Sequence, residues 1–337
     1  MLFLVKTMEN LVKKTKGLTR TQNRLIFYCI MLIWPVIQTS LFYFYVNFNT
    51  FALAFQEVDF GGATHGFTLN NFSIAWNELI VGQITYILNS LKFFAIDFPI
   101  ALVLALTFSF YIYKKYPGAG LFKTMLFMPS LLSGLVFCIL FKYLSSYGYQ
   151  EIRCLLDSLP VTATNRQAYT PLLEGVDTAM PTVIFFNIWI SFGSNILLYS
   201  GAMSGIDESV VESSKLDGAN LLQEMFHITL PLIFPTIISL VVVSLTGVFT
   251  NQLSLVSLFG ETFPNEDVKE RIVTVGYKMF IYAKHLTTAS QTNMDMFGSG
   301  YYDAGELSAY GLAVSVVIIP MVLGIRKLMK KYGPSTD

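Results

Sequence analysis

Six apolar runs, each long enough to cross a bilayer as a helix, constrain this chain more than any other feature. A hydrocarbon core of about 30 Å needs roughly 20 apolar residues in helical conformation. The runs cover residues 25–48, 89–113, 121–144, 180–204, 229–256 and 306–326. Only 13% of the 337 residues are charged, about half the fraction usual in soluble domains. We therefore expect an all-α, polytopic membrane protein with six transmembrane helices.

The placement of lysine and arginine predicts how these helices are oriented, because cytoplasmic loops are enriched in both residues. Basic residues dominate segment 1–24, the turn at 114–123 and the C-terminal tail, whereas segment 49–88 has acidic residues and no Lys or Arg. Both termini are therefore expected in the cytoplasm. The predicted divisions are a cytoplasmic segment 1–24, a membrane domain 25–329, outer loops at about 49–88, 145–178 and 257–304, and a cytoplasmic tail 330–337.

Segment 205–228 departs from this charge pattern. Alternation places it in the cytoplasm, yet it carries five acidic residues against Lys215 alone. Acidic residues count little in the orientation rule, so the predicted topology stands. Such a segment is a poor ligand for anionic lipid headgroups. By itself it fits either a solvated loop or a surface that contacts a protein.

Capping signals in the same segment predict two short helices separated by a turn. Ser209 and Glu212 have the spacing of a capping box, and Gly218 can take the positive φ that ends a helix. Asn220, with Gln223 three residues later, is suited to cap the second helix. Two prolines follow: we expect Pro231 in the first turn of the fifth transmembrane helix and a kink at Pro235.

The residue order of this segment closely resembles the EAA motif of ABC importer permeases of the maltose-type carbohydrate (oligosaccharide) uptake family. The match has serine in place of both alanines and reads Glu212-Ser213-Ser214-x-x-Asp217-Gly218-Ala219, then Phe226-x-Ile228-x-Leu230-Pro231. In that family the loop docks on the cytoplasmic ATPase. The resemblance therefore implies a coupling loop at about 205–228, with ATPase-coupling residues Glu212, Ser213, Ser214, Asp217, Gly218 and Ala219.

Other parts of the chain are similar to the same family from about residue 25 onward. The similar stretches are Ala52–Gln56, Phe122–Pro129, Asn187–Leu198 and Gly305–Tyr310. The outer loops 145–178 and 257–304 match poorly. Because the second of these is long for a loop without structure, it is predicted to include an ordered, functional element.

The resemblance implies a type I ABC importer permease fold in the bacterial cytoplasmic (inner) membrane. It also implies three kinds of partner: a homologous second permease, two cytoplasmic ABC ATPase subunits and an extracytoplasmic solute-binding protein. No G-x-x-x-x-G-K-[ST] phosphate-binding loop occurs in the chain. ATP and Mg are thus expected on the partner subunits, with no cofactor in this chain, which is not expected to be an enzyme.

Polar residues within the runs mark a candidate translocation face, since polar side chains in a membrane span usually face protein or water. They recur at helical spacing in the fourth run and at the end of the fifth. Either they line the path of a hydroxyl-rich solute or they form helix–helix hydrogen bonds. The candidates are Asn187, Ser191, Asn195, Tyr199, Thr250 and Asn251. Asp97, inside the second run, needs a counter-charge that a partner subunit could supply.

The family likeness and the neutral polar faces favour an oligosaccharide or glycan fragment as the solute. A polyol, glycerol-phosphate or polyamine is the alternative within the same machinery. A secondary transporter is disfavoured because ionisable residues in the runs are few. The sequence shows no catalytic or metal-ligating cluster, which argues against a membrane enzyme, and a net charge of zero argues against nucleic-acid binding.

Overall fold

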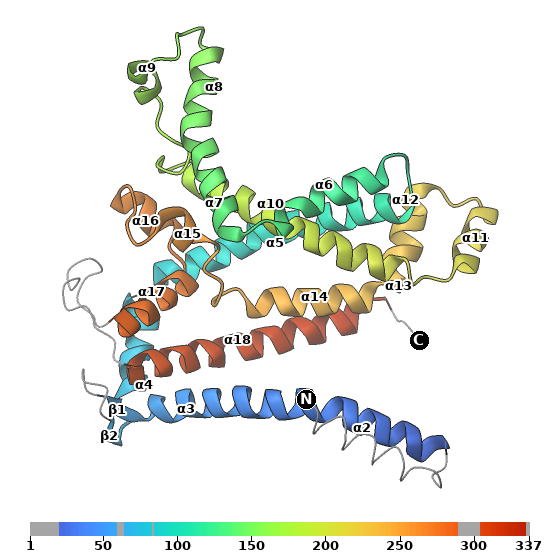
Figure 1. Cartoon of the computed structure of the whole chain (residues 1–337), viewed down its shortest axis with the longest axis horizontal. Coiled ribbons are helices and arrows are strands. Elements are labelled where there is room, and N and C mark those ends of the chain that lie inside the picture. The colour runs from blue at the N-terminus through green and yellow to red at the C-terminus, as the bar shows by residue number, and fades with distance from the viewer. Residues whose placement is uncertain (1–19, 59–63, 83, 289–303, 335–337) are drawn as a thin grey trace, which may run out of the picture.

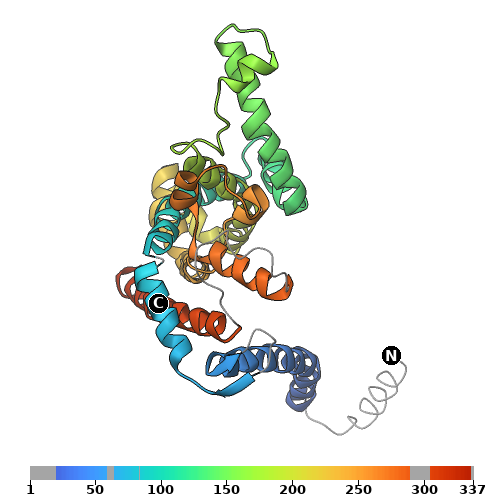
Figure 2. The ribbon, with the colours of Figure 1, turned by 90° about the vertical axis from the view of Figure 1, so that its left-hand side faces the viewer.

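The structure, a computed structural model, is a bundle of long helices (Figures 1 and 2). It describes residues 20–58, 64–82, 84–288 and 304–334; most of the predicted N-terminal segment and the end of the tail lie outside these residues. Within the described part, four helices are long and apolar enough to cross a membrane, or six if each of two bent pairs counts as one span. The four are Arg24–Ala54, Ile84–Tyr113, Ala179–Met203 and Ala304–Tyr332. The six predicted spans are thus met only with the bent pairs counted as single spans.

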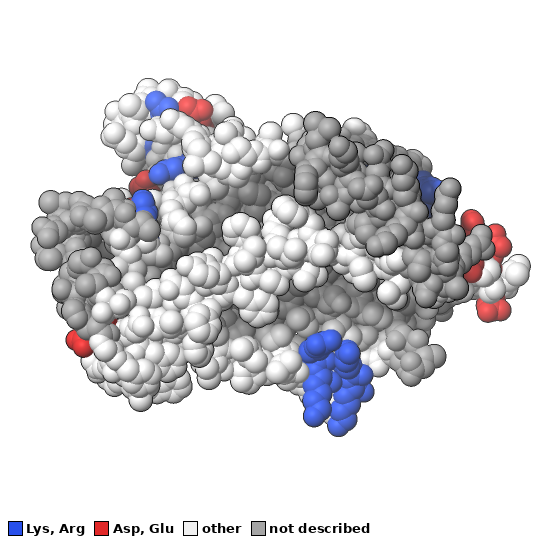
Figure 3. Space-filling view, turned by 60° about the horizontal axis from the view of Figure 1, so that its bottom comes forward, with Lys and Arg blue, Asp and Glu red and all other residues white. Residues whose placement is uncertain are grey.

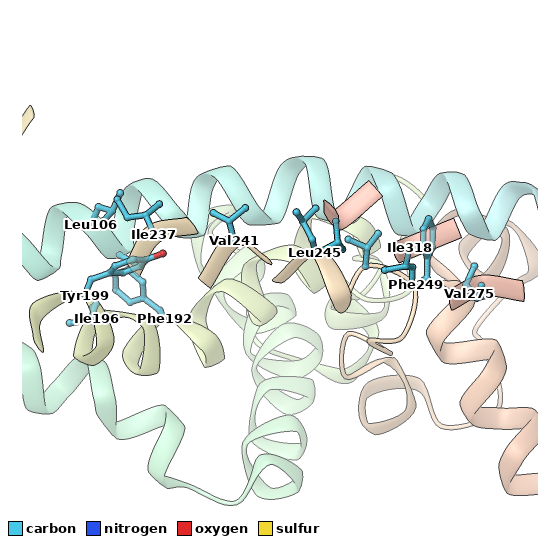
Figure 4. Close-up of a cluster of buried hydrophobic side chains, with 14 of the residues drawn as sticks. Leu106, Phe192, Ile196, Tyr199, Ile237, Val241, Leu245, Phe249, Val275 and Ile318 are labelled. Atoms are coloured by element: carbon cyan, nitrogen blue, oxygen red, sulfur yellow. The ribbon is translucent and has the colours of Figure 1, made fainter. Parts of the chain in front are cut away.

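The centre of the bundle is formed by α5 (Ile84–Tyr113), α10 (Ala179–Met203), α14 (Phe234–Thr246) and α18 (Ala304–Tyr332). α10 packs along α5 and α6 (Ala119–Leu131), and α14 packs along α18. Apolar side chains from these helices form one buried cluster, in which Leu106, Ile196 and Ile237 come from three different helices (Figure 4). Helices that are apolar around much of their surface bury one face here and leave the rest for lipid or partner chains.

A close approach of α10 to α6 depends on Gly193. A Cβ atom at this position would lie 2.4 Å from the backbone oxygen of Leu126 and 2.7 Å from Cα of Phe127. Glycine is thus the one residue that lets the two backbones come this near.

The first span lies at the edge of the molecule. It consists of α2 (Arg20–Thr39), a π-helical segment η1 (Ser40–Phe44) and α3 (Tyr45–Ala54). Its most apolar window has no residue buried within this chain. Among the described residues, α3 packs against the start of α18 (Figure 1), which holds this end of the span.

The third predicted span is sharply bent. α6 ends at Leu131, and the next helix, which runs from α7 (Gly134–Tyr143) through η3 (Leu144–Gly148) to α8 (Tyr149–Leu156), leaves at 98°. Leu132 and Ser133 have extended ψ values of 152° and 125°, which interrupt the helical hydrogen bonds. The α7–α8 helix therefore projects from the bundle as an arm (Figure 1), tipped by α9 (Ala163–Gln167).

The fifth predicted span is also broken, so the prediction of one helix over 229–256 is wrong in detail. Helix Leu221–Leu232, made of α12 (Leu221–Gln223), η4 (Glu224–Thr229) and α13 (Leu230–Leu232), meets α14 at 69°. Pro235 has no N–H, and its ring would clash with the carbonyl of Pro231 in a continuous helix. The kink predicted at Pro235 is thus present, whereas Pro231 lies before the bend, in the short α13, and not in the first turn of α14. α14 ends at Thr246.

The predicted outer ends carry shorter elements. After α3 comes a two-stranded antiparallel hairpin, β1 (Gln56–Val58) with β2 (Thr64–Phe67), and then α4 (Asn70–Asn77) and η2 (Glu78–Gly82). After α14 come α15 (Leu255–Phe259), α16 (Glu266–Ile272) and α17 (Val275–Thr288). The prediction of an ordered element in loop 257–304 is confirmed for residues up to 288, and residues 289–303 lie outside the described part.

Candidate coupling loop and translocation face

The predicted coupling loop begins with a capped helix, α11 (Glu208–Leu216). Its cap is Asp207, whose Oδ1 accepts a hydrogen bond from the backbone N–H of Ser209 at 3.0 Å. This bond, with a further one from the Ser209 hydroxyl, holds the pKa of Asp207 below its usual range. The predicted capping box from Ser209 to Glu212 is wrong, because Ser209 already lies inside the helix.

The turn after α11 has the predicted left-handed glycine. Gly218 has φ of +79°. Its N–H donates to the carbonyl of Lys215 at 3.1 Å, and the N–H of Ala219 donates to that of Ser214 at 3.0 Å. These two bonds form a Schellman motif, which satisfies the last carbonyls of the helix. The chain therefore reverses sharply at Asp217-Gly218.

The second helix of the loop starts at the predicted capping box. Asn220 Oδ1 accepts from the N–H of Gln223 at 2.9 Å, and Gln223 Oε1 accepts from the N–H of Asn220 at 2.8 Å. The next turn is the π-helical segment η4, whose backbone hydrogen bonds span five residues and not the four of an α-helix. This helix leads directly into the bend before α14.

One side of α11 is held against the second helix, and the other is free within this chain. Val211 and Ser214 are buried, and α11 contacts η4. The apolar side chains of Leu216 and Val210 are 89% and 41% exposed. The other coupling candidates differ in exposure. Ala219 is half-buried, and the exposed ones are Glu212, Ser213, Asp217 and Gly218.

Both serines that replace the family's alanines bond within α11. Ser213 Oγ donates to the carbonyl of Ser209, and Ser214 Oγ donates to that of Val211, each at 2.8 Å. The hydroxyls are thereby satisfied without a partner from outside the helix. Serine can therefore take the place of alanine here without leaving a polar group unpaired.

Acidic side chains gather at the end of the molecule where α11 lies (Figures 1 and 3). The exposed face of α11 thus combines negative charge with apolar side chains. Such a combination suits a protein partner better than anionic lipid, which would be repelled.

An ion pair that the sequence did not reveal ties this loop to the turn between α5 and α6. Glu224, in η4, pairs with Lys114, and the two side chains are 5% and 13% exposed. Lys114 Nζ also lies 5.6 Å from the ring centroid of Phe110 and 5.5 Å from that of Tyr113. The partners are 110 residues apart in sequence, so no local pattern could have paired them.

The candidate translocation residues on α10 have different surroundings. Asn187 is 9% exposed, and its amide donates to the carbonyls of Val183 at 2.9 Å and Leu253 at 3.2 Å. Tyr199 is 3% exposed and lies in the apolar cluster beside Leu106 (Figure 4). These two side chains thus serve the packing of this chain. Ser191 and Asn195 are half-buried.

The segment 247–254, after α14, is not regular helix. Leu253 and Ser254 have φ of +52° and +58°, which is costly for residues other than glycine. Asn251 Oδ1 accepts from the N–H of Leu253 at 2.9 Å, and Thr250 and Asn251 are exposed. Irregular backbone at membrane depth is tolerated where it is buried in protein or lines a water-filled cavity. This segment lies against α10, because the Asn187 amide donates to the carbonyl of Leu253.

Asp97 of α5 remains an internal acid without a hydrogen bond at one oxygen. Its Oδ1 is buried and has no partner among the described residues. Elsewhere in the described part, no group of three or more His, Cys, Asp or Glu side chains could hold a metal ion.

Comparison with known proteins identifies the family. Residues 97–330 match the family described as "binding-protein-dependent transport system inner membrane component". The chain belongs to this family. It is therefore an integral inner-membrane permease of an ABC importer, and the loop 205–228 lies within the matched region.

Two curated relatives illustrate the similarity. The chain is 24% identical over 314 residues to the arabinooligosaccharides transport system permease protein AraP of Bacillus subtilis, a match that covers 89% of this chain and 86% of AraP. It is 26% identical over 314 residues to the multiple sugar-binding transport system permease protein MsmF of Streptococcus mutans, covering 89% and 94%.

A solved structure shows the same fold. It is the crystal structure of a bacterial ABC transporter involved in the import of the acidic polysaccharide alginate, and the match has a TM-score of 0.68 at 18% identity. It covers 96% of this chain and 99% of the matched chain. The ABC importer permease fold implied by the resemblance is confirmed.

Proposed function

We propose that this permease forms, with a homologous second permease, the membrane path of an ATP-driven importer for an oligosaccharide or glycan fragment. Two cytoplasmic ATPase subunits bind ATP and Mg and drive the cycle through loop 205–228. An extracytoplasmic solute-binding protein delivers the solute. Both termini of the chain lie in the cytoplasm, in keeping with the basic residues near them.

The observation that carries this proposal is the form of the coupling loop. α11 ends in a Schellman motif with both of its hydrogen bonds formed. Its Val211 and Ser214 side chains are buried, and its Leu216 side chain is exposed. A helix that is anchored to the spans but exposes an apolar, acidic face is suited to fit a cleft on a partner and to transmit its movement. The ion pair between Lys114 and Glu224 joins the loop to α5 and α6.

The relatives and the polar residues support the class of solute. Two of the relatives are named as permeases for arabinooligosaccharides and for multiple sugars. The irregular segment 247–254 offers Thr250 and Asn251, and α10 offers Ser191 and Asn195. These side chains supply hydrogen-bond donors and acceptors without net charge, which is what a hydroxyl-rich solute requires. Asn187 and Tyr199 would then support this face from behind.

Uptake by cells tests the proposal. A strain that lacks this chain would be assayed for uptake of radiolabelled arabinotriose, maltotriose, sorbitol, glycerol-3-phosphate and spermidine. We expect loss of uptake of a saccharide, restored by the wild-type chain but not by Leu216→Asp. The matched control is Leu328→Asp, a 56% exposed position on α18. Unchanged saccharide uptake with loss of spermidine or glycerol-3-phosphate uptake would contradict the solute class.

A further inference from the structure

A pocket of about 780 Å³ lies between the base of the arm and α15, away from the translocation face. Its walls come from the end of α7 and from the two outer loops, 145–178 and 257–304. Figure 1 shows the arm rising beside α15 and α16. The volume falls within the range of about 300–1,000 Å³ typical of small-molecule sites.

The two loops are fastened to each other, so the pocket is a built feature. Asn265 Nδ2 donates to the carbonyl of Glu174 at 3.3 Å, and Arg271 pairs with Asp177 at 2.7 Å. Within the arm, the Gln150 amide donates to the carbonyl of Tyr169 at 2.7 Å. These bonds join α16, the turns at residues 169–178 and α8 around one space.

Two pairs of stacked aromatic rings contribute to the lining. Tyr143 and Tyr147 stack on the arm, with ring centroids 5.7 Å apart and planes at 26°. Phe259 and Phe263 stack on the other wall, with centroids 5.0 Å apart, also at 26°. Tyr147 is 54% exposed, so a ring face remains free for a ligand.

Polar side chains also line the pocket. Lys142 and Glu174 contribute one charge of each sign, so the pocket has no net charge from them. The uncharged polar lining residues are Ser146, Gln150, Gln167 and Thr262. A neutral saccharide stacks the C–H face of its ring on aromatic side chains and forms hydrogen bonds with amides and hydroxyls. The lining offers both kinds of group.

We infer that this pocket is an outer saccharide subsite, which holds a neutral oligosaccharide unit on the extracytoplasmic side before it enters the translocation path. The inference rests on the proposed function for the solute class and for the side of the membrane. It concerns residues separate from the translocation candidates, none of which lines the pocket. The two outer loops are thereby given a role in capturing this chain's own solute.

Binding by the whole transporter tests the subsite. The complex of this chain with its second permease and ATPase subunits would be placed in lipid nanodiscs, without solute-binding protein or ATP. Saturation-transfer NMR would then titrate arabinotriose, maltotriose and an acidic mannuronate trisaccharide. The variants are Tyr147→Ala, which removes an exposed ring, and Tyr147→Phe, which keeps it. Tyr45→Ala, at a 78% exposed tyrosine on α3, is the matched control.

We expect at least one neutral trisaccharide to bind saturably and more tightly than the acidic one. Tyr147→Ala should raise its half-saturating concentration about three- to tenfold, as for loss of one stacking contact. Tyr147→Phe and Tyr45→Ala should leave it within twofold. Wild-type affinity in Tyr147→Ala, or no saturable binding of any neutral trisaccharide, would overturn the subsite.

The uptake assay separates the two possible failures. If the chain is required for saccharide uptake but the pocket variants bind like wild type, only the subsite is wrong. If the chain imports no saccharide, the proposed solute class fails as well. Protein yield and basal ATP hydrolysis of Tyr147→Ala and Tyr45→Ala would be compared to show that both complexes assemble.

Discussion

Breaking the ion pair between Lys114 and Glu224 should be among the most damaging single changes near loop 205–228 of this permease. Both side chains are almost wholly buried. Lys114→Met leaves the carboxylate of Glu224 buried without a counter-charge, at a cost of about 3–5 kcal/mol. Replacing both residues by methionine removes the stranded charge, and such exchanges of a buried pair are often neutral or stabilising.

The assay is a double-mutant cycle. Free energies of unfolding would be measured in detergent micelles for the wild type, Lys114→Met, Glu224→Met and the double variant. We expect the double variant to be more stable than either single variant, with a coupling energy of at least about 2 kcal/mol. Solute-stimulated ATP hydrolysis in the reconstituted complex should fall in both single variants, because the loop loses its tie to α5. Additive single effects would refute a direct pairing.

Three further changes probe the loop and the bundle. Gly218→Val should lower the free energy of unfolding by about 1–2 kcal/mol through the positive φ alone, since a Cβ there meets nothing within 4 Å. It should also reduce solute-stimulated ATP hydrolysis. Gly218→Asn, which tolerates this φ, should not. Gly193→Ala should cost about 1–3 kcal/mol and lower the yield of folded protein, whereas Gly201→Ala, where a Cβ has open space, should leave the yield unchanged. Asp207 has a depressed pKa, so its capping contributes stability above the ordinary value of 3.8 and loses it as pH falls through the lower folded value; unfolding measured between pH 7 and pH 3 should show a larger loss for the wild type than for Asp207→Ala, and equal losses would contradict the cap.

The local features of the coupling loop could be predicted from the sequence because each depends on residues three to five positions apart. The Gly218 turn and the cap from Asn220 to Gln223 are of this kind. The spacing of Ser209 and Glu212 predicted the wrong cap, because Asp207, two residues earlier, takes that role. The kink at Pro235 was also predictable, because a proline breaks the helix locally, but Pro231 lies in α13 before the bend and not in the first turn of α14.

Features that depend on distant contacts were not predictable. Hydropathy does not distinguish a straight apolar helix from a bent or interrupted one, so the 98° bend after α6 and the irregular segment 247–254 were missed. Helical spacing put Tyr199 on the same face as Asn195, but packing of α10 against α5 and α14 buries its ring. The pairing of Lys114 with Glu224 and the pocket between two outer loops follow only from the fold.

Cross-linking from α11 tests most directly the central claim that this helix docks on the ATPase. In a Cys29→Ser background, which removes the exposed native thiol, Leu216→Cys would carry a benzophenone label in the assembled transporter. Leu328→Cys is the control at an exposed position of α18. We predict light-dependent attachment of the ATPase subunit to residue 216 and not to residue 328, with a yield that changes on addition of ATP. Labelling of lipid alone from residue 216 would contradict the account.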